Sequence, residues 1–387
     1  MDLDSFFVSV ERLREPKLNG IPLLIGGSSN RGVVASCSYE ARKFGIHSAM
    51  PMKMAKRLCP HATVIGGDSE QYSKYSHLVT EVIAEQVPLY EKSSIDEFYI
   101  DLTGMERFHN SYLLAQKIKR DIKRETGLAI SFGHSVNKTV SKIATNESKP
   151  NGFCRIEKGA EKGFLSPLTV NKIPQVGNKT YHTLRSMGVV KVKTLQQMPV
   201  ELIENVLGKN GRSLWHKAQG VDHSPVRPYS EQKSISSEQT FHQDTIDTHY
   251  LKGVLVGMTE RLSFKLRKQK KLTACIAVKI RYSDFDTQTM QCHLPYTSCD
   301  HVLIRKAKEL FDRLYQRRML IRLVGIRFSH LVGGAYQINL FDDTEEMVKL
   351  YQAMDHIRLR FGDDKVKRAL AMDVKYMKMN PFNGAIT

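Results

Sequence analysis

Three acidic side chains in two distant segments have the chemistry of a metal site. Asp96 and Glu97 stand side by side in SSIDEFYIDL, residues 93–102, and Asp2 stands at the start of the chain in MDLDSFF. Neighbouring residues on a regular strand point to opposite faces, so the backbone must turn there if Asp96 and Glu97 serve one site. Three carboxylates together repel one another unless cations compensate. Mg²⁺ takes hard oxygen ligands, and two such ions about 4 Å apart clamp the attacking and leaving oxygens of a phosphoryl transfer.

Simpler interpretations of the acidic residues stay open at this point. The adjacent pair would be solvated turn residues, and the N-terminal aspartate would be frayed, if the two segments do not meet. Asp4 lies on the same face of a strand as Asp2, but it also precedes the helix expected from Ser5, and we expect it to cap that helix. Asp101 is expected to have a structural role.

Basic and aromatic side chains that suit a triphosphate occur in two further stretches. In SYEARKFGI, residues 38–46, Tyr39 and Arg42 are three apart and share a face of a helical turn. Arginine binds phosphate oxygens through paired donors, and a phenol adds a neutral donor. Lys149 precedes a Pro-Asn-Gly turn that would hold its ammonium in place. Singly each would be a surface residue, but together with the carboxylates they favour a nucleotide site, one without the P-loop motif G-x-x-x-x-G-K-[ST].

Length and charge indicate a multidomain protein with an anionic partner. The 387 residues, 41% of them hydrophobic, predict about three domains of roughly 100 to 150 residues each. Lysine and arginine number 58 against 40 aspartates and glutamates, and the formal charge of +18 favours nucleic acid as the partner. Membrane surfaces attract such a charge too, but no stretch approaches the roughly 18 apolar residues of a membrane span.

The cysteines predict reduced thiols. They form no CxxC pair and no Cys/His spacing of a zinc module. The N-terminus has no basic region ahead of an apolar segment, so we expect a cytoplasmic protein with neither an export signal nor an anchor. The six cysteines are Cys37, Cys59, Cys154, Cys275, Cys292 and Cys299.

The first 160 residues have an α/β pattern. Apolar runs predict strands at residues 21–25, 33–36, 98–102, 129–136 and 152–156. Helical patterns lie between them at residues 5–13, 51–58, 69–85, 111–126 and 138–148. Asn137 is the expected N-cap of the last of these helices.

Later segments predict an all-α module and then a second α/β domain. From about residue 165 to 222, short helices are separated by glycine hairpins at 174–177 and 208–211. The stretch DHSPVRPYSEQKS has the composition of a linker, so a boundary is expected near residue 230. The βαββαβ order beyond it predicts one sheet with two helices on one face, and the tail is expected to be helical at 344–351 and 355–360. The six elements are expected at residues 234–241, 245–268, 272–282, 287–296, 299–317 and 322–331.

Two features of these segments suit a DNA backbone. The hairpins would expose N–H groups at helix N-termini, which bind phosphate without reading sequence. KLRKQKK, residues 265–271, carries five basic residues in seven and would track a DNA strand. Ordinary turns and a solvated helix end are the alternatives. The candidate DNA-binding residues are Gly177, Lys179, Lys209, Lys265, Arg267, Lys268, Lys270 and Lys271.

The chain resembles the Y-family translesion DNA polymerases, of the bacterial DNA polymerase IV type, to about residue 341. The motifs that carry the resemblance are DLDSFFVSVE, SYEARKFGI, SIDEFYIDLTG, SFGHSVNKTVSKIATNESKPNG, KIPQVGNKT and LGKNGRSLW. Family members usually have several residues before the first acidic ligand, whereas only Met1 precedes Asp2 here. The resemblance implies an α/β multidomain, right-hand polymerase. Its parts would be an α/β palm at 1–10 and 71–160, small fingers at 11–70, an all-α helix-hairpin-helix thumb at 161–230, a βαββαβ little finger at 231–341 and a helical tail at 342–387.

The resemblance also implies roles for single residues. Asp2, Asp96 and Glu97 would hold two Mg²⁺ ions, with help from the backbone carbonyl of Leu3. Phe7 would lie under the sugar of the incoming nucleotide and exclude ribonucleotides, although a Phe on a short amphipathic helix otherwise belongs to the core. The residues lining the triphosphate would be Ser36, Tyr39, Arg42 and Lys149.

A short peptide near the end of the last domain resembles the motif by which bacterial polymerases dock on the sliding clamp. In QINLF, residues 337–341, Leu340 and Phe341 would be apolar anchors in a groove, and Gln337 would hydrogen-bond at its rim. The alternative is a strand that ends in the core.

The expected activity is template-directed addition of deoxynucleoside triphosphates to a primer by a monomer bound to primer-template DNA, with two Mg²⁺ ions as cofactors. We find no additional acidic exonuclease cluster in the sequence, so fidelity would rest on active-site geometry alone and be low. A non-catalytic DNA-binding scaffold would have no physical use for clustered carboxylates. A two-metal nuclease would have no use for Phe7 and Tyr39.

Overall fold

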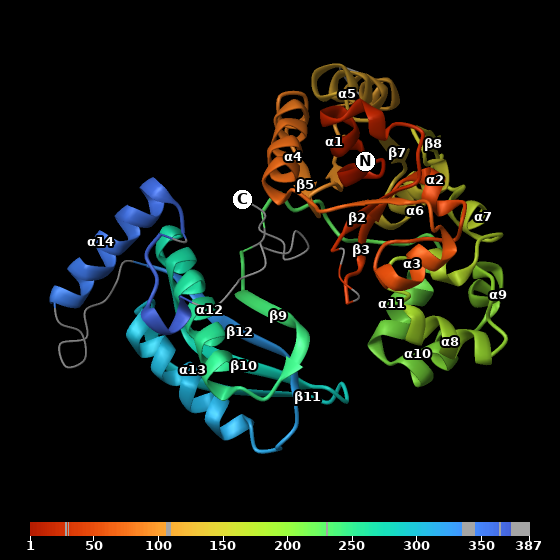
Figure 1. The fold of residues 1–387 in the computed structure, drawn as a ribbon. Coiled ribbons are helices and arrows are strands. Elements are labelled where there is room, and N and C mark those ends of the chain that lie inside the picture. The colour runs from red at the N-terminus through yellow and green to blue at the C-terminus, as the bar shows by residue number, and fades with distance from the viewer. Residues whose placement is uncertain are drawn as a thin grey trace. The chain divides into compact units, whose positions relative to one another are not determined.

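The computed structural model of this chain divides into two compact units, Met1–Ser230 and Glu231–Asn383, which are described separately (Figure 1). The described residues are 1–27, 29, 31–105, 110–229, 231–334, 345–363 and 365–372. In this part of the chain, none of the helices combines the length and the apolar character that a bilayer-spanning segment needs.

The first unit is built around a small sheet in which the N-terminal strand pairs with a distant one. The strand order is β1-β7-β8, with β1 antiparallel and β8 parallel to the central strand. Two helices, α5 and α6, pack against β7. The bounds are β1 Asp2–Leu3, β7 Ile130–His134, β8 Phe153–Arg155, α5 Ser111–Thr126 and α6 Lys138–Ser148.

The helix α6 begins as predicted and lies unusually close to the sheet. The side chain of Asn137 accepts a hydrogen bond from the N–H of Val140 at 2.9 Å, which confirms the expected cap. At Gly133 a Cβ atom would stand 2.3 Å from the carbonyl oxygen of Ser141, so only glycine allows this approach. The hydroxyl of Thr145 accepts from the N–H of Gly133 at 2.8 Å. Strand and helix are therefore held in a fixed register.

Two further groups of elements complete the α/β part of this unit. A hairpin of β5 and β6 and the helices α1 and α4 share a core that includes Leu3, Phe6, Tyr72, Phe98 and Ile130. A second sheet, ordered β3-β2-β4, has its own core with α2 and α3. The bounds are β2 Leu23–Gly26, β3 Val34–Cys37, β4 Thr63–Ile65, β5 Tyr90–Lys92, β6 Phe98–Ile100, α1 Phe6–Arg14, α2 Tyr39–Arg42, α3 Met52–Leu58 and α4 Ser69–Ala84.

The predicted all-α module is present and packs on α6. Val140, Ile143 and Ala144 belong to the same buried cluster as the apolar residues of the module. One detail of the prediction is wrong: the second turn is made by Gly208 alone, with φ 63°, because Gly211 is buried against the backbone of Ile203 inside the next helix. The helices are α7 Glu161–Leu165, α8 Asn178–Ser186, α9 Val192–Gln197, α10 Val200–Leu207 and α11 Lys209–Ala218.

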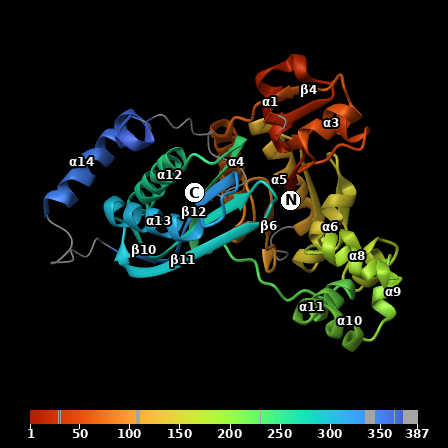
Figure 2. The ribbon, with the colours of Figure 1, turned by 60° about the horizontal axis from the view of Figure 1, so that its bottom comes forward.

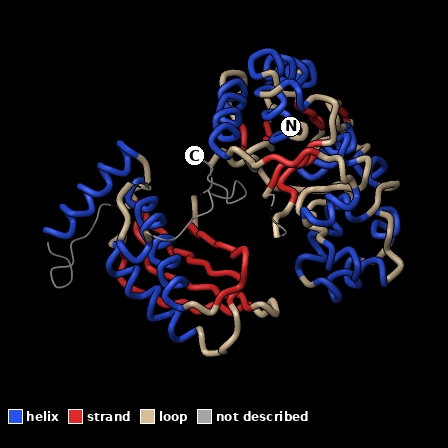
Figure 3. The backbone as a smooth tube through the Cα atoms, viewed as in Figure 1, coloured by secondary structure: helices blue, strands red, loops and turns tan. Residues whose placement is uncertain are grey.

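The second unit contains the predicted βαββαβ sequence of elements. All three strand pairings are antiparallel, in the order β11-β10-β12-β9. Figures 2 and 3 show α12 and α13 lying together on one face of this sheet. The bounds are β9 Ser234–Thr245, α12 Thr248–Lys268, β10 Lys271–Tyr282, β11 Thr287–Thr297, α13 Asp300–Leu314 and β12 Ile321–Gly333.

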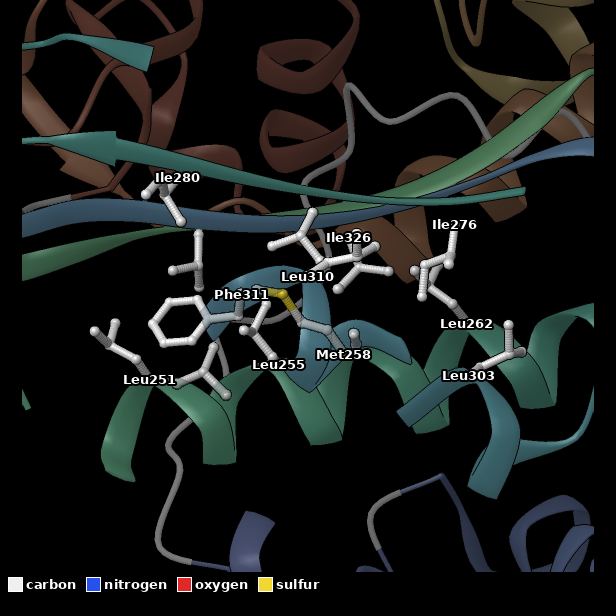
Figure 4. Packing of buried hydrophobic residues seen from close by; sticks show 14 of the residues in the cluster. Leu251, Leu255, Met258, Leu262, Ile276, Ile280, Leu303, Leu310, Phe311 and Ile326 are labelled. Carbon is white, nitrogen blue, oxygen red and sulfur yellow. The ribbon is translucent and has the colours of Figure 1, made fainter. Parts of the chain in front are cut away.

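Alternating residues of the central strands fill the core between the sheet and the two helices. Ile276 and Ile280 of β10 and Ile326 of β12 point toward α12 and α13, whose buried side chains include Leu255 and Phe311 (Figure 4). Since strand side chains alternate between faces, the odd-numbered residues of β10 lie on the face that these helices leave uncovered.

The described part of the tail contains a short 3-10 turn at Ala369–Ala371 and one α-helix, α14 (Glu345–Phe361), where two shorter helical segments were predicted. The helix α14 is held to α12 and α13 by an ion-pair network with little solvent access. Arg267 pairs with Asp300 and Asp355 at 2.6 Å each, and Arg358 lies 3.8 Å from Glu260.

The network corrects the prediction for Arg267. The guanidinium is turned to two carboxylates and is only 16% exposed, so it holds the tail helix in place and does not present itself to a DNA strand. The basic run 265–271 gave no sign of this, because one of its partners lies 88 residues away in sequence.

We predict that Arg267→Ala lowers the free energy of unfolding of the second unit by about 3–5 kcal/mol, because the buried Asp300 loses its hydrogen-bonded partner and is left with the more distant Arg358, at 4.0 Å. Urea unfolding followed by circular dichroism measures this. The matched control is Lys268→Ala, an exposed neighbour that should change the stability by less than about 0.5 kcal/mol. Equal stabilities of the two variants would contradict a structural role for Arg267.

Candidate active site

The backbone bends immediately before Glu97, as the adjacent carboxylates require. The hydroxyl of Ser94 donates to the carboxylate of Asp96 at 2.6 Å and accepts from the N–H of Glu97 at 3.1 Å. The N–H of Ser93 also donates to the carbonyl of Glu97 at 3.0 Å. The bend takes Asp96 out of regular strand alternation, so both carboxylates can serve one site.

The strand β1 brings Asp2 to this bend. The N–H of Leu3 donates to the carbonyl of Asp96 at 3.0 Å, and the N–H of Phe98 donates to the carbonyl of Met1 at 2.9 Å. Asp2 lies directly opposite Glu97 in this short antiparallel pairing. Directly opposed residues project from the same face of a sheet, so the segments predicted to meet do meet.

The three carboxylates interact electrostatically. Burial raises the pKa of Asp2 to about 6; the ammonium of Lys149 opposes this rise, and the charges of Asp96 and Glu97 add to it. Burial also raises the pKa of Asp96, against the hydrogen bond from Ser94. A cation that binds beside a buried acidic group with a raised pKa stabilises the ionised form of that group.

Two lysines, Lys142 within α6 and Lys149 at its C-cap, supply positive charge at the site. The ammonium of Lys149 lies 2.5 Å from Asp2, and that of Lys142 lies 2.7 Å from Glu97. The sequence interpretation missed Lys142, although the signal was available. It precedes Lys149, the C-cap of α6, by seven residues, which is about two helical turns, so both side chains start from the same side of the helix.

Asp4 does not cap α1, so that prediction is wrong. Ser5 occupies the N-cap position with φ 43° and makes no capping hydrogen bond. The carboxylate of Asp4 is buried and accepts from the hydroxyl of Ser131 at 2.9 and 3.0 Å, from the N–H of Asn151 at 2.8 Å and from the hydroxyl of Tyr39 at 3.3 Å. It thus ties together the strand β7, the turn after Lys149 and the helix α2.

The side chains predicted to line a triphosphate have the expected local geometry. Tyr39 and Arg42 share one helical turn, with the guanidinium 4.6 Å from the ring centroid. Burial and the charge of Asp4 raise the pKa of Tyr39 to about 12, so the phenol keeps its proton and remains a donor. Ser36 is half-buried on β3. Their role toward a nucleotide stays a prediction.

Phe7 lies in the core at one end of this region. It is 6% exposed and stacks on Tyr72 with centroids 4.1 Å apart. The hydroxyl of Tyr72 donates to Glu11 at 2.7 Å, which fixes the ring behind Phe7. The side chain of Leu3 is also buried, so its backbone is held firmly beside Asp2.

The remaining described candidate residues belong to the all-α module and to the second unit. Gly177 is the exposed N-cap of α8. Lys265 and Lys271 are half-buried, and burial lowers the pKa of Lys265. The QINLF motif, with Gln337, Leu340 and Phe341, lies outside the described residues. The exposed lysines of the predicted DNA-binding set are Lys179, Lys209, Lys268 and Lys270.

The carboxylates fit a hard divalent cation by their donor chemistry. Asp2, Asp96 and Glu97 offer only oxygen donors, and Mg²⁺ is bound through carboxylates and substrate phosphates. The raised pKa of Asp2 adds a second argument, since Lys149 offsets only part of the cost of burying this charge.

Known proteins match most of this chain. The impB/mucB/samB family matches residues 1–146, its C-terminal domain matches 232–340, and a thumb domain described for DNA polymerase iota matches 171–222. DNA polymerase IV of Dehalococcoides mccartyi is 37% identical over 381 residues, which cover 97% of this chain and 98% of that one. DNA polymerase IV of Exiguobacterium sibiricum is 39% identical over 335 residues, 86% of this chain and 93% of that one. A solved Y-family polymerase chimera of Dbh and Dpo4 has a TM-score of 0.75 at 26% identity and covers 86% of this chain and 98% of its own.

An α/β body with gathered carboxylates, an all-α module and a βαββαβ domain together define a nucleotidyltransferase that works on nucleic acid. The chain belongs to the impB/mucB/samB family, the Y-family of translesion DNA polymerases. It is a DNA-directed DNA polymerase and resembles the enzymes named DNA polymerase IV.

We predict that Asp4→Asn raises the KM for the incoming nucleotide more than it lowers kcat, because Tyr39 and the turn at 149–151 lose their common anchor. The NH2 group of the new asparagine would also face a group that donates to Asp4 in the wild type, and this should destabilise the first unit by about 1–3 kcal/mol. Steady-state primer extension and urea unfolding measure the two effects.

Asp101→Asn is the matched control, since Asp101 accepts only a local hydrogen bond from the N–H of Thr103 at 2.9 Å among its described contacts. An Asp4→Asn variant with the KM of the wild type would contradict a positioning role.

Proposed function

We propose that the enzyme adds deoxynucleotides to a primer by two-Mg²⁺ phosphoryl transfer, in the manner of translesion polymerases. The primer 3′ oxygen attacks the α-phosphate, and pyrophosphate leaves. The observation that carries the proposal is the meeting of Asp2, Asp96 and Glu97 at one bend. Bound Mg²⁺ ions would supply the positive charge that the three carboxylates lack and that the transition state needs.

The side chains of the protein would position the ions and the triphosphate and neutralise their charge. The carboxylates, with the carbonyl of Leu3, would hold the ions. Arg42 and Tyr39 on one helical turn, with Ser36 and Lys149, would bind the triphosphate. Lys149 contacts Asp2 at 2.5 Å, so nucleotide binding would draw this ammonium from a carboxylate toward a phosphate.

The partners would be primer-template DNA and deoxynucleoside triphosphates. A solved insertion ternary complex of Dbh DNA polymerase, 25% identical with a TM-score of 0.63, supports this proposal. Backbone N–H groups in the first turn of α8, after Gly177, and the exposed lysines would contact phosphate without reading sequence. The domain boundaries would be those implied for palm, fingers, thumb and little finger, and the enzyme would act in the cytoplasm as a monomer.

Fidelity and clamp binding belong to the same proposal. Without a proofreading site, selection would rest on the geometry of the nucleotide pocket and would be low. Leu340 and Phe341 of QINLF would attach the polymerase to a sliding clamp, with Gln337 at the rim. A scaffold that only binds DNA is disfavoured, because clustered carboxylates repel a polyanion.

We predict that Asp96→Ala combined with Glu97→Ala abolishes Mg²⁺-dependent primer extension while DNA binding persists, since only the ion ligands are removed. Extension of a labelled primer on a template, with a parallel filter-binding assay, tests this. Asp101→Ala is the control. Asp101 lies four residues after Glu97, directly after β6, and the variant should keep its activity. Extension by the double variant would refute the metal-ligand assignment.

We predict that Phe7→Ala lowers the discrimination against ribonucleotides by at least about tenfold, because the ring that collides with a 2′-hydroxyl is removed. The ratio of kcat/KM for deoxyribonucleotides to that for ribonucleotides is the measured quantity. Phe6→Ala controls for loss of core packing, since Phe6 is 3% exposed in the same cluster. An unchanged ratio in Phe7→Ala would show that Phe7 serves the core alone.

A further inference from the structure

A cysteine and two histidines come together on the sheet of the second unit, far along the chain from the carboxylates. Cys275 lies on β10, His293 on β11 and His330 on β12. One potential ligand atom of each lies within 4.8 Å of the others. The three residues come from three neighbouring strands, so their spacing in the sequence does not match that of a zinc module.

The three side chains gather where the sheet departs from regular geometry. The pairing of β10 with β11 shifts register between Thr273 and Cys275, a bulge-like irregularity in which Thr273 lies opposite Thr297 and Cys275 opposite His293. His330 has φ 53°, in the left-handed region that non-glycine residues seldom adopt. Bulges and strained residues re-aim side chains and are common at functional sites. Both irregularities fall on residues of this cluster or beside them.

The cluster lies on the sheet face that α12 and α13 leave uncovered. Cys275 is directly opposite His293, so both project to one face, whereas Ile276 and Cys292 on the neighbouring positions belong to or pack against the helix-covered core. Cys275 is fully buried, and both histidines are exposed. The thiol is therefore fixed, and the two imidazoles are free to adjust around it.

The donor chemistry selects the class of ion. Thiolate and imidazole are ligands for Zn²⁺ and similar borderline ions, while Mg²⁺ and Ca²⁺ require oxygen. Bonds of roughly 2.0–2.3 Å place tetrahedral ligand atoms about 3.3–3.8 Å apart, so closure of the cluster by about 1 Å completes the geometry. The rings of His293 and His330, 5.1 Å apart between centroids, need only small rotations for this.

We propose that Cys275, His293 and His330 form a binding site for Zn²⁺ or a chemically similar divalent ion, with a fourth position open to water on the uncovered face of the sheet. The ion would join the strands β11, β10 and β12 across the bulge. It would differ from the Mg²⁺ ions proposed for the active site in ligand type and in the unit that holds it.

Cobalt titration of the metal-free full-length protein tests the proposal in the presence of excess Mg²⁺. One equivalent of Co²⁺ should give a thiolate-to-cobalt absorption band, and Zn²⁺ should displace it. Cys275→Ala should abolish the band. The matched control is Cys292→Ala, which removes a thiol from the helix-facing side of β11 and should leave the band unchanged. A band that persists in Cys275→Ala, or no band in the wild type, overturns the proposal.

The exposed histidines keep the test decisive if loss of the buried thiol disturbs folding. His293→Ala and His330→Asn should each weaken Co²⁺ and Zn²⁺ binding by at least about tenfold. Asparagine is chosen at position 330 because it tolerates positive φ. His242→Ala, an exposed histidine on β9, should bind as the wild type does. Zn²⁺ should raise the unfolding temperature of the wild type and of His242→Ala, and it should have little effect on that of His293→Ala and His330→Asn. Equal affinities across all three histidine variants would refute the site.

Discussion

Mutual repulsion of three neighbouring carboxylates is the constraint around which the first unit is built. Asp2, Asp96 and Glu97 belong to segments that come together only in the fold, and burial makes their charge more costly than it would be in water. The protein offsets part of this cost with Lys142 and Lys149. These two cations are also the groups that a bound triphosphate would attract, so the charge balance of the site changes as substrate and metal ions enter.

The local architecture follows from the need to hold these groups against their repulsion. The two-residue strand β1 is bonded on one side to β7 and on the other to the bend before Glu97, so it cannot shift toward or away from the acidic pair. Gly133 lets α6 lie directly on β7, which sets the distance from the lysines to the carboxylates. Asp4, on the same short segment, adds a third connection through Ser131 and Tyr39.

The sequence was sufficient where local patterns decide the structure and insufficient where distant partners do. The limits of α5 and α6 were predicted to the residue, because amphipathic periodicity and asparagine caps act within a few positions. The need for a bend before Glu97 followed from strand alternation alone. By contrast, Asp4 was assigned to a local cap, while its partners lie 127 and 147 residues away. Arg267 was misassigned for the same reason, and β5, only three residues long, has too few positions for alternation to be detected.

The two donor sets of this chain differ in hardness, and this difference determines which ions each can hold. Carboxylate oxygens accept Mg²⁺, which keeps water and phosphate as further ligands and exchanges with substrate. A thiolate with two imidazoles holds Zn²⁺ far better than Mg²⁺, so the abundant ion does not occupy it. An ion there would stabilise an irregular sheet without entering the reaction. The different hardness of the two donor sets would therefore keep a structural ion and catalytic ions apart on one polypeptide.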